Sequence, residues 1–168
     1  MEVFEAILKR RSIRKYLNKP IEEEKIIKIL EAARWAPSGG NRQPWRFIII
    51  RNEKKKIELS KIAYNQKFIK EAPLVIAICN KKDESLANIG LAMQNICLEA
   101  FDLGLGSCII GWFNKEEARK FFNIPEEYDI CYLITIGYPA EKPISNRKKL
   151  EEIVYEEEWG CHFQTKIS

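Results

Sequence analysis

Residues 10–16 read Arg-Arg-Ser-Ile-Arg-Lys-Tyr and place three guanidinium groups and one hydroxyl within five positions. Arginine presents a planar fork of donors that matches phosphate oxygens two at a time, and Ser12 adds a neutral donor. A basic cluster is also common at the solvated end of a helix, where the helix dipole favours cations. The stretch therefore predicts either an anion-binding site or a solvated helix end.

Amphipathic helices are expected on both sides of this stretch. Apolar residues recur at helical spacing at Val3, Phe4, Ile7 and Leu8 before it, and at Ile26, Ile27, Ile29, Leu30, Ala33 and Ala36 after it. Pro37 stops the second helix. Further along, strands are predicted at residues 45–50, 74–79, 107–110 and 128–138, and helices at about 53–63, 85–103 and 115–122.

The order of these elements indicates the fold class. Helices and strands alternate irregularly, which favours an α+β fold with helices around one sheet over a doubly wound fold. The stretch 128–138 contains few polar residues and is expected to be an inner strand with both faces covered. Because no linker, repeat or low-complexity tract divides the chain, residues 1–168 are expected to form a single domain.

Composition and charge exclude several classes of protein. The chain has 46% hydrophobic and 31% charged residues, the balance of an ordinary globular protein. Its formal charge of +4 does not demand nucleic acid as a partner. Cys79, Cys97, Cys108 and Cys131 lie in apolar segments, which favours reduced, buried thiols. The first residues lack the cations of a signal peptide and no apolar run approaches a membrane span, so a cytoplasmic protein without membrane contact is expected.

The loop at residues 37–44, Pro-Ser-Gly-Gly-Asn-Arg-Gln-Pro, displays compact polar chemistry. Ser38, Asn41 and Gln43 stand beside two glycines that let a backbone approach a ligand closely. Asparagine and glutamine amides carry donors and acceptors that can bind the edge of a heterocycle. The same residues also make a good helix stop and turn, so both interpretations stay open.

Two further segments are candidates for binding. Residues 103–112 contain three glycines, but they follow a helix and precede a strand, the reverse of a dinucleotide-binding fingerprint. We interpret them as a helix stop and a strand whose backbone, freed by Gly111, either lies against a flat ligand or is plain core. Arg147 and Lys148 follow two prolines and either complete a phosphate site or form a solvated turn.

No residue set supports the commoner hydrolytic chemistries. The single histidine, His162, lies in a C-terminal tail with no obvious partner, and no HExxH, EF-hand or Walker pattern is present, so no metal site and no catalytic side chain are predicted. An enzyme of this composition would need a borrowed cofactor to supply its chemistry.

Four of these features, taken in order, resemble the FMN-dependent nitroreductase family. They are RRSIRKY near the N-terminus, APSGGNRQPWRF after the second helix, GLGSCIIGWF after a long apolar helix, and a late strand that ends in Tyr-Pro and precedes a basic turn. The resemblance spans nearly the whole chain. It implies an α+β fold with a central, mostly antiparallel sheet surrounded by helices, and an intertwined homodimer with FMN at the subunit interface.

The resemblance also implies roles for individual residues. The residues that match the contacts to the phosphate, the ribityl chain and the flavin edge are Arg10, Arg11, Ser12 and Arg14. The residues that match the loop reaching FMN from the partner subunit are Pro37, Ser38, Asn41 and Gln43. The strand against the flavin ring is matched by Ile109, Ile110 and Gly111, and the late phosphate contact by Arg147 and, more weakly, Lys148. Some family members carry an acidic residue where this chain has Gly111, so a mechanism using that carboxylate does not transfer.

The activity implied is a ping-pong transfer of hydride from NADH or NADPH, through N5 of FMN, to an electron-poor small molecule such as a nitroaromatic or a quinone. The family resemblance leaves a flavin-binding redox sensor or storage protein without efficient turnover as the alternative. A small nucleic-acid-binding module is a third hypothesis, with the basic cluster at residues 10–15 for phosphates and with Tyr16 and Trp45 as stacking platforms.

Overall fold

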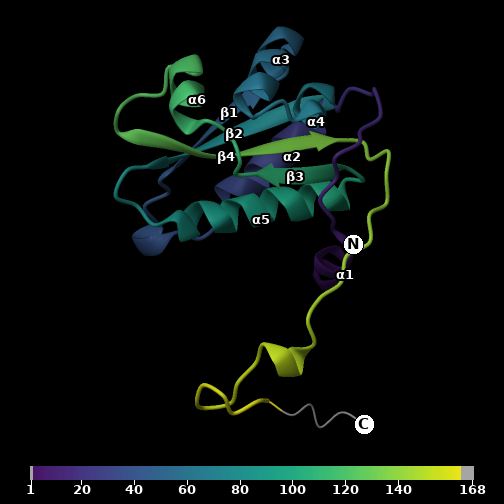
Figure 1. The fold of residues 1–168 in the computed structure, drawn as a ribbon, viewed down its shortest axis with the longest axis vertical. Helices are drawn as coiled ribbons and strands as arrows, with labels where there is room; N and C mark the ends of the chain where they lie inside the picture. The colour runs from purple at the N-terminus through teal and green to yellow at the C-terminus, as the bar shows by residue number, and fades with distance from the viewer. Residues whose placement is uncertain (1, 164–168) are drawn as a thin grey trace.

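A computed structural model describes residues 2–163 as an α+β structure built around one antiparallel sheet (Figure 1). The strands are β1 (Trp45–Ile50), β2 (Leu74–Lys81), β3 (Gly106–Ile110) and β4 (Tyr128–Gly137), in the order β1-β2-β4-β3. The helices are α1 (Val3–Lys9), α2 (Glu23–Arg34), α3 (Glu53–Ile62), α4 (Lys67–Glu71), α5 (Leu86–Asp102) and α6 (Lys115–Phe121), with short 3-10 helices η1 (Gly39–Asn41) and η2 (Leu150–Glu152).

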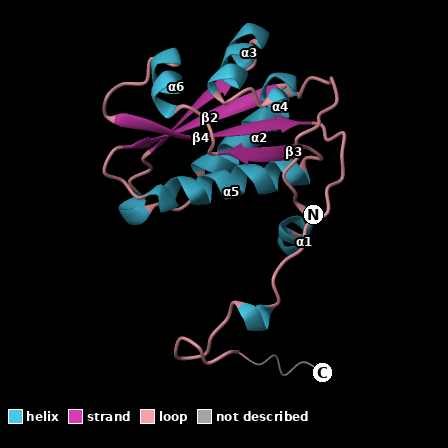
Figure 2. Cartoon of the chain, in the orientation of Figure 1, coloured by secondary structure: helices cyan, strands magenta, loops and turns pink. Residues whose placement is uncertain are grey.

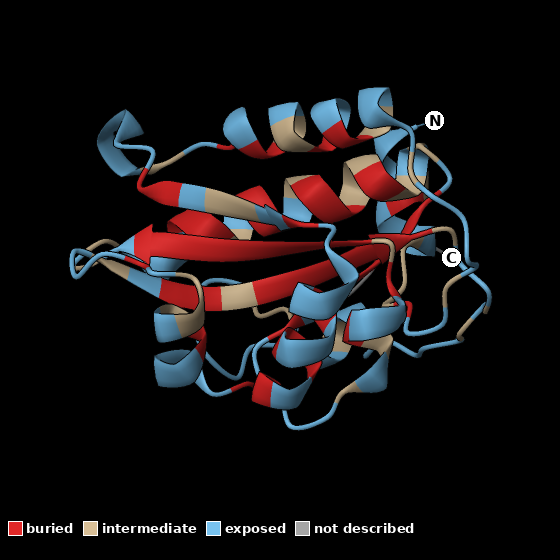
Figure 3. Cartoon of the chain, turned by 90° about the horizontal axis from the view of Figure 1, so that it is seen from above, coloured by how far each residue is buried: buried red, intermediate tan, exposed pale blue. Residues whose placement is uncertain are grey.

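Helices cover both faces of the sheet, α2 and α5 on one face and α3, α4 and α6 on the other (Figure 2). Alternate residues of β2 point to opposite sides, so Ile76 and Ile78 pack with α2 and α5 while Val75 and Ala77 pack with α3, α4 and α6. The strands are the most continuously buried part of the chain (Figure 3). Because alternate side chains of a strand point to opposite faces and both faces are buried, the sheet separates two apolar cores.

The observed elements confirm the predicted α+β fold and the predicted strands. β4 pairs with β2 on one side and β3 on the other, as expected of an inner strand. Side-chain caps begin three of the predicted helices, because Asn52, Ser85 and Asn114 each accept a hydrogen bond from a backbone N–H in the first turn. The five-residue helix α4 was not predicted.

The chain after β4 leaves the body of the domain as an extended tail that includes η2 (Figure 1). Its side chains include Ile144, 93% exposed, and Trp159, 89% exposed. Helix α1 likewise exposes Val3 and Phe4, each to 69%. Exposed apolar groups gathered on a terminal helix and a tail are typical of surfaces that bind another chain.

The thiols of Cys79, Cys97, Cys108 and Cys131 are free and buried, as expected, while Cys161 in the tail is exposed. Within residues 2–163, no helix is both long enough and apolar enough to cross a bilayer.

Candidate functional site

The basic stretch at residues 10–16 runs beside β3 and is fixed there by backbone contacts. Ser12 pairs in parallel with Ser107, and the Ile13 N–H donates to the Ser107 carbonyl at 2.9 Å. A Cβ added to Gly106 would lie 2.5 Å from Cγ1 of Ile13, so only glycine allows the two segments this close approach. The Tyr16 hydroxyl donates to the Ile13 carbonyl at 2.6 Å and anchors the other end of the stretch.

Three of the predicted side chains converge on the thiol of Cys108 in β3. Burial and, more weakly, the charge of Glu141 raise the pKa of Cys108, while the positive charge of Arg14, a hydrogen bond with Ser12 and the charge of Arg10 lower this pKa. The Ser12 hydroxyl is thus a hydrogen-bond partner of this thiol, and the charges of Arg10 and Arg14 act on the same part of the strand. Arg11 differs, because its guanidinium donates to the carbonyls of Leu8 and Arg10.

The guanidinium groups at this point form no ion pair among the described residues, although one carboxylate is close: Glu141 accepts a hydrogen bond from the Arg14 backbone N–H and lines the same cavity. Within the described chain, neither Arg10, Arg11 nor Arg14 takes part in an ion pair closer than 4.0 Å. Beside them lies a cavity of about 530 Å³, to which Arg10, Ser107 and Phe101 contribute. Concentrated positive charge beside a cavity is an arrangement that attracts anions.

The loop at residues 37–43 is held open by contacts at its base. The Gly39 N–H donates to Oδ1 of Asn88 in α5 at 3.1 Å, and the Gln43 N–H donates to the Ser38 hydroxyl at 2.9 Å. Asn41 and Gln43 have φ of 53° and 50°, in the left-handed region that side chains other than glycine adopt at a cost, and both are exposed. The loop therefore exposes both residues from a constrained backbone, and the Gln43 amide donates to the Asn41 carbonyl at 3.2 Å.

The end of β3 differs in part from the sequence interpretation. Ile109 is 39% exposed and Gly111 is exposed, whereas Ile110 is 4% exposed and belongs to the core against α3 and α6. The side chain of Ile110 is therefore core, and only its backbone is open to a ligand role. Pro37 is exposed at the end of α2.

An aromatic pair beside Gly111 was missed by sequence reasoning. The rings of Tyr64 and Trp112 lie 4.8 Å apart, and Nε2 of Gln66 donates to the Trp112 carbonyl at 2.7 Å. Trp112 is nevertheless 68% exposed. No local pattern could have found this pair, because its members are far apart in sequence and meet only through the packing of α3 against the end of β3.

The predicted residues fall at two distant places in the chain. The loop at 37–43 contacts Asn88 at the beginning of α5, whereas the basic stretch at 10–16 contacts Ser107 just after the end of that helix. Fourteen residues of helix separate these ends by about 20 Å at 1.5 Å per residue. One chain therefore does not bring the loop and the arginines together, as the positions of η1 and α1 in Figure 1 also show.

The late basic residues lie in the extended tail. Arg147 donates to its neighbours, the Ser145 hydroxyl and the Asn146 carbonyl, each at 2.9 Å, and Lys148 is exposed. The nucleic-acid hypothesis is not supported, because Trp45 is only 5% exposed and packs in the core against α2 and α5. A buried indole cannot stack on a base.

A comparison with protein families matches the nitroreductase family over residues 7–82 and 60–138. The chain belongs to the nitroreductase family. The matched region contains the basic stretch, the loop and the end of β3, but not Arg147 or Lys148. The resemblance drawn from the four motifs is thereby confirmed.

Individual members of the nitroreductase family agree with this assignment. A Methanothermobacter thermautotrophicus protein with the provisional name NADH dehydrogenase/NAD(P)H nitroreductase is 39% identical over 155 residues, covering 85% of this chain and 80% of that protein. NADH dehydrogenase of Thermus thermophilus is 31% identical, covering 89% and 93%. The structure of an FMN-dependent nitroreductase from Clostridium difficile superposes with a TM-score of 0.85 at 32% identity, covering 92% and 98%.

Proposed function

We propose that this chain is an FMN-dependent oxidoreductase that takes electrons from NADH or NADPH and delivers them to small electron-poor acceptors such as nitroaromatics or quinones. When bound, FMN supplies hydride chemistry at its N5 atom, and donor and acceptor use the same site in turn, a ping-pong scheme. Relatives of the chain carry the names NAD(P)H nitroreductase and, for a Bacillus subtilis protein that is 26% identical, FMN reductase (NAD(P)H), which supports this reaction class.

The observation that carries the proposal is the convergence of Arg10, Ser12 and Arg14 beside β3. Two guanidinium groups that form no ion pair within the described residues, together with one neutral hydroxyl, fit the oxygens of a phosphate monoester. The Glu141 carboxylate accepts from the Arg14 backbone N–H, which leaves the donors of the Arg14 side chain available. Their positive charge also favours the transfer of negative charge to a bound cofactor. Arg11 contributes differently, since it fixes the end of α1 through the Leu8 carbonyl.

The end of β3 fits a flat ring system. Gly111 is exposed and has no side chain, so the backbone at 109–111 can lie against a planar ligand and donate hydrogen bonds to its edge. Ile109 adds an exposed apolar contact, and Trp112 with Tyr64 borders the same end of the strand. In this arrangement the protein binds and orients, which agrees with the prediction from sequence that the chemistry is carried by the cofactor.

A homodimer completes the proposed site. Pro37, Ser38, Asn41 and Gln43 lie at the opposite end of α5 from the arginines, so a second chain must bring its loop to them. The exposed apolar residues of α1 and of the tail provide surface for such a partner. In the dimer, Arg147 and Lys148 are assigned to the phosphate end.

Complementation between two variants tests the shared site. Arg10→Ala and Asn41→Ala should each lose most bound FMN, because each removes one half of every site. When the two variants are co-expressed, mixed dimers contain one intact site, and FMN content and NAD(P)H oxidation with a quinone should recover partly. Arg34→Ala, an exposed arginine paired with Glu31 on α2, is the matched control. A mixture no better than either variant contradicts a shared site.

Turnover separates the enzyme from a redox sensor or storage protein. Anaerobic mixing of the FMN-loaded protein with NADH or NADPH should bleach the flavin absorbance within seconds, and a quinone should restore it. Flavin that stays oxidised after both nucleotides are added contradicts the enzymatic proposal and supports the sensor.

A further inference from the structure

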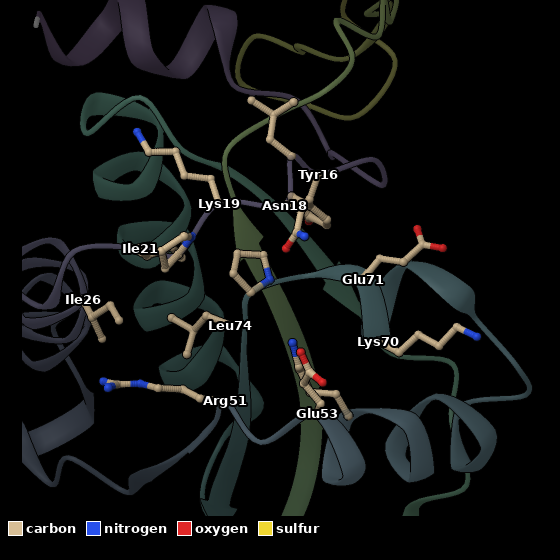
Figure 4. Close-up of a pocket in the computed structure, with 14 residues that line it drawn as sticks. Tyr16, Asn18, Lys19, Ile21, Ile26, Arg51, Glu53, Lys70, Glu71 and Leu74 are labelled. Atoms are coloured by element: carbon tan, nitrogen blue, oxygen red, sulfur yellow. The ribbon is translucent and has the colours of Figure 1, made fainter.

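A second cavity, of about 640 Å³, lies away from the residues assigned to FMN (Figure 4). Its walls come from the segment 16–21, from α2, from the beginning of α3, from α4 and from the first residue of β2. Ile21, Ile26, Pro73 and Leu74 form an apolar lining. The volume falls within the roughly 300–1,000 Å³ that small-molecule sites occupy.

The charged lining of this cavity contains one buried cation, Lys56. Its side chain belongs to a residue only 6% exposed, and its ammonium donates to the Ala72 carbonyl at 2.6 Å. In the part of the chain that the structure describes, Lys56 forms no ion pair. An ammonium has three N–H donors, so a single carbonyl leaves it incompletely satisfied, and a buried charge that forms no ion pair is costly. The carboxylate of Glu53 is close enough to raise the pKa of Lys56 but forms no ion pair with it.

The other cations around the cavity, Lys19, Arg51 and Lys70, are placed less well than Lys56 to bind an anion inside it. Lys19 forms an ion pair with Glu22 and Arg51 forms one with Glu23, and neither of these glutamates lines the cavity. In Figure 4 the charged ends of Lys19, Arg51 and Lys70 point away from the centre of the cavity, whereas the Asn18 amide points towards it. The cavity thus combines one interior positive charge, one amide and an apolar wall, and the carboxylates of Glu53 and Glu71 also belong to its lining. Because Lys19, Arg51, Lys56 and Lys70 stand against these two carboxylates, the lining keeps a net positive charge.

We propose that this cavity binds a small organic acid, with its carboxylate on Lys56 and its apolar body against Ile21, Ile26 and Leu74. Burial lowers the pKa of Lys56, whereas the negative charge of the nearby Glu53 raises it. A bound carboxylate would act in the same direction as Glu53, because a second negative charge also favours the protonated ammonium. The site is separate from the FMN residues, although Tyr16 in its lining ends the same basic stretch.

A purely structural role for Lys56 is the competing explanation. Ala72 is the C-cap residue that follows α4, and a cation near helix C-terminal carbonyls is favourable on its own. The two roles differ in one measurable respect. A structural lysine affects the free energy of unfolding only, whereas a ligand-binding lysine also sets the affinity for an anion.

Methyl NMR of the full chain loaded with FMN tests the proposal, with benzoate as the probe. Saturable shifts should appear at the methyl groups of Ile21, Ile26 and Leu74. Benzamide, the uncharged analogue, should give none. Shifts confined to Ile109 and Ile110 would place benzoate beside the proposed flavin segment instead and overturn the assignment, as would no saturable shift at all.

Substitutions identify the charge responsible. Lys56→Met should weaken benzoate binding by about tenfold or more, the effect of losing a hydrogen bond to a charged group. Lys55→Met, its exposed neighbour on α3, should leave the affinity unchanged. If Lys56→Met does not fold, Asn18→Trp, an exposed position that narrows the cavity mouth, should weaken binding by a similar factor. Equal affinity in Lys56→Met, or in Asn18→Trp when it is used, refutes the site.

The outcome does not depend on the flavin proposal. Methyl signals of the cavity report benzoate binding whether or not the chain retains FMN. The Lys56→Met variant should also keep its FMN content, because no predicted FMN residue contacts Lys56 in the structure. Loss of FMN by wild-type protein would therefore contradict the proposed function while leaving the cavity test intact.

Discussion

Gly106→Ala is the most direct perturbation of the contact that positions the basic stretch. An added Cβ would lie 2.5 Å from Cγ1, 2.8 Å from Cβ and 3.0 Å from Cγ2 of Ile13. Ordinary carbon contacts are about 3.5–4.0 Å, so the two segments must separate by about 1 Å. Ile13 stands between Ser12 and Arg14, and the displacement therefore moves the predicted phosphate contacts as well as the core.

The expected cost follows from overpacking. Forcing one extra carbon into a filled site costs about 1–3 kcal/mol of unfolding free energy. The affinity for FMN should fall by about tenfold, which corresponds to about 1.4 kcal/mol of lost contacts. Urea denaturation of the apoprotein measures the first quantity, and titration of FMN fluorescence measures the second.

Gly90→Ala is the matched control, because a Cβ there meets nothing within 4 Å and Gly90 lies inside α5. Alanine should stabilise that helix by up to about 1 kcal/mol. A double variant Ile13→Ala with Gly106→Ala should cost less than the sum of the two single variants, since the contacts with Cγ1 and Cγ2 disappear and only the one with Cβ remains. The reasoning is refuted if Gly106→Ala matches the parent in both unfolding free energy and FMN affinity.

Three further outcomes are expected. Tyr16→Phe should lower the unfolding free energy by about 1–3 kcal/mol in urea denaturation, because the Ile13 carbonyl loses its buried donor. A thiol reagent should label Cys161 rapidly and the four buried cysteines slowly, and Cys161→Ser should abolish the fast phase. Burial raises the pKa of Cys79 to about 12, so its contribution to stability is lost as pH rises from about 9 towards 12, and Cys79→Ala should flatten that decline.

The fold was predictable because its elements carry strong periodic patterns. The stretch 128–138 has few polar residues and forms β4, the inner strand that pairs on both sides. The central helix, predicted at 85–103, is α5, bounded by the Ser85 cap and Gly104. Helix α4 was not predictable in the same way, because five residues give little more than one turn of periodicity.

The site was only partly predictable, since sequence shows which residue types are present but not which side chains remain free. The interpretation of residues 109–111 as a strand against a ligand could not separate exposed Ile109 from buried Ile110. Trp45 has the composition of a stacking platform, yet the sheet places it in the core. The pair of Tyr64 and Trp112 depends on tertiary packing and left no local signal.

The separation of the loop from the arginines has a thermodynamic consequence for the proposed dimer. If Asn41 of one chain and Arg10 of the other both contact one FMN, the ligand binds the dimer more tightly than the monomer and stabilises association by linkage. Diluting the FMN-loaded protein should then release flavin in parallel with dissociation, and added FMN should shift the dissociation midpoint to lower protein concentration. Sedimentation at several protein concentrations, followed at the flavin absorbance, measures both. A monomer that sediments with stoichiometric FMN contradicts the shared site, because the roughly 20 Å of α5 between the two halves prevents one chain from supplying both.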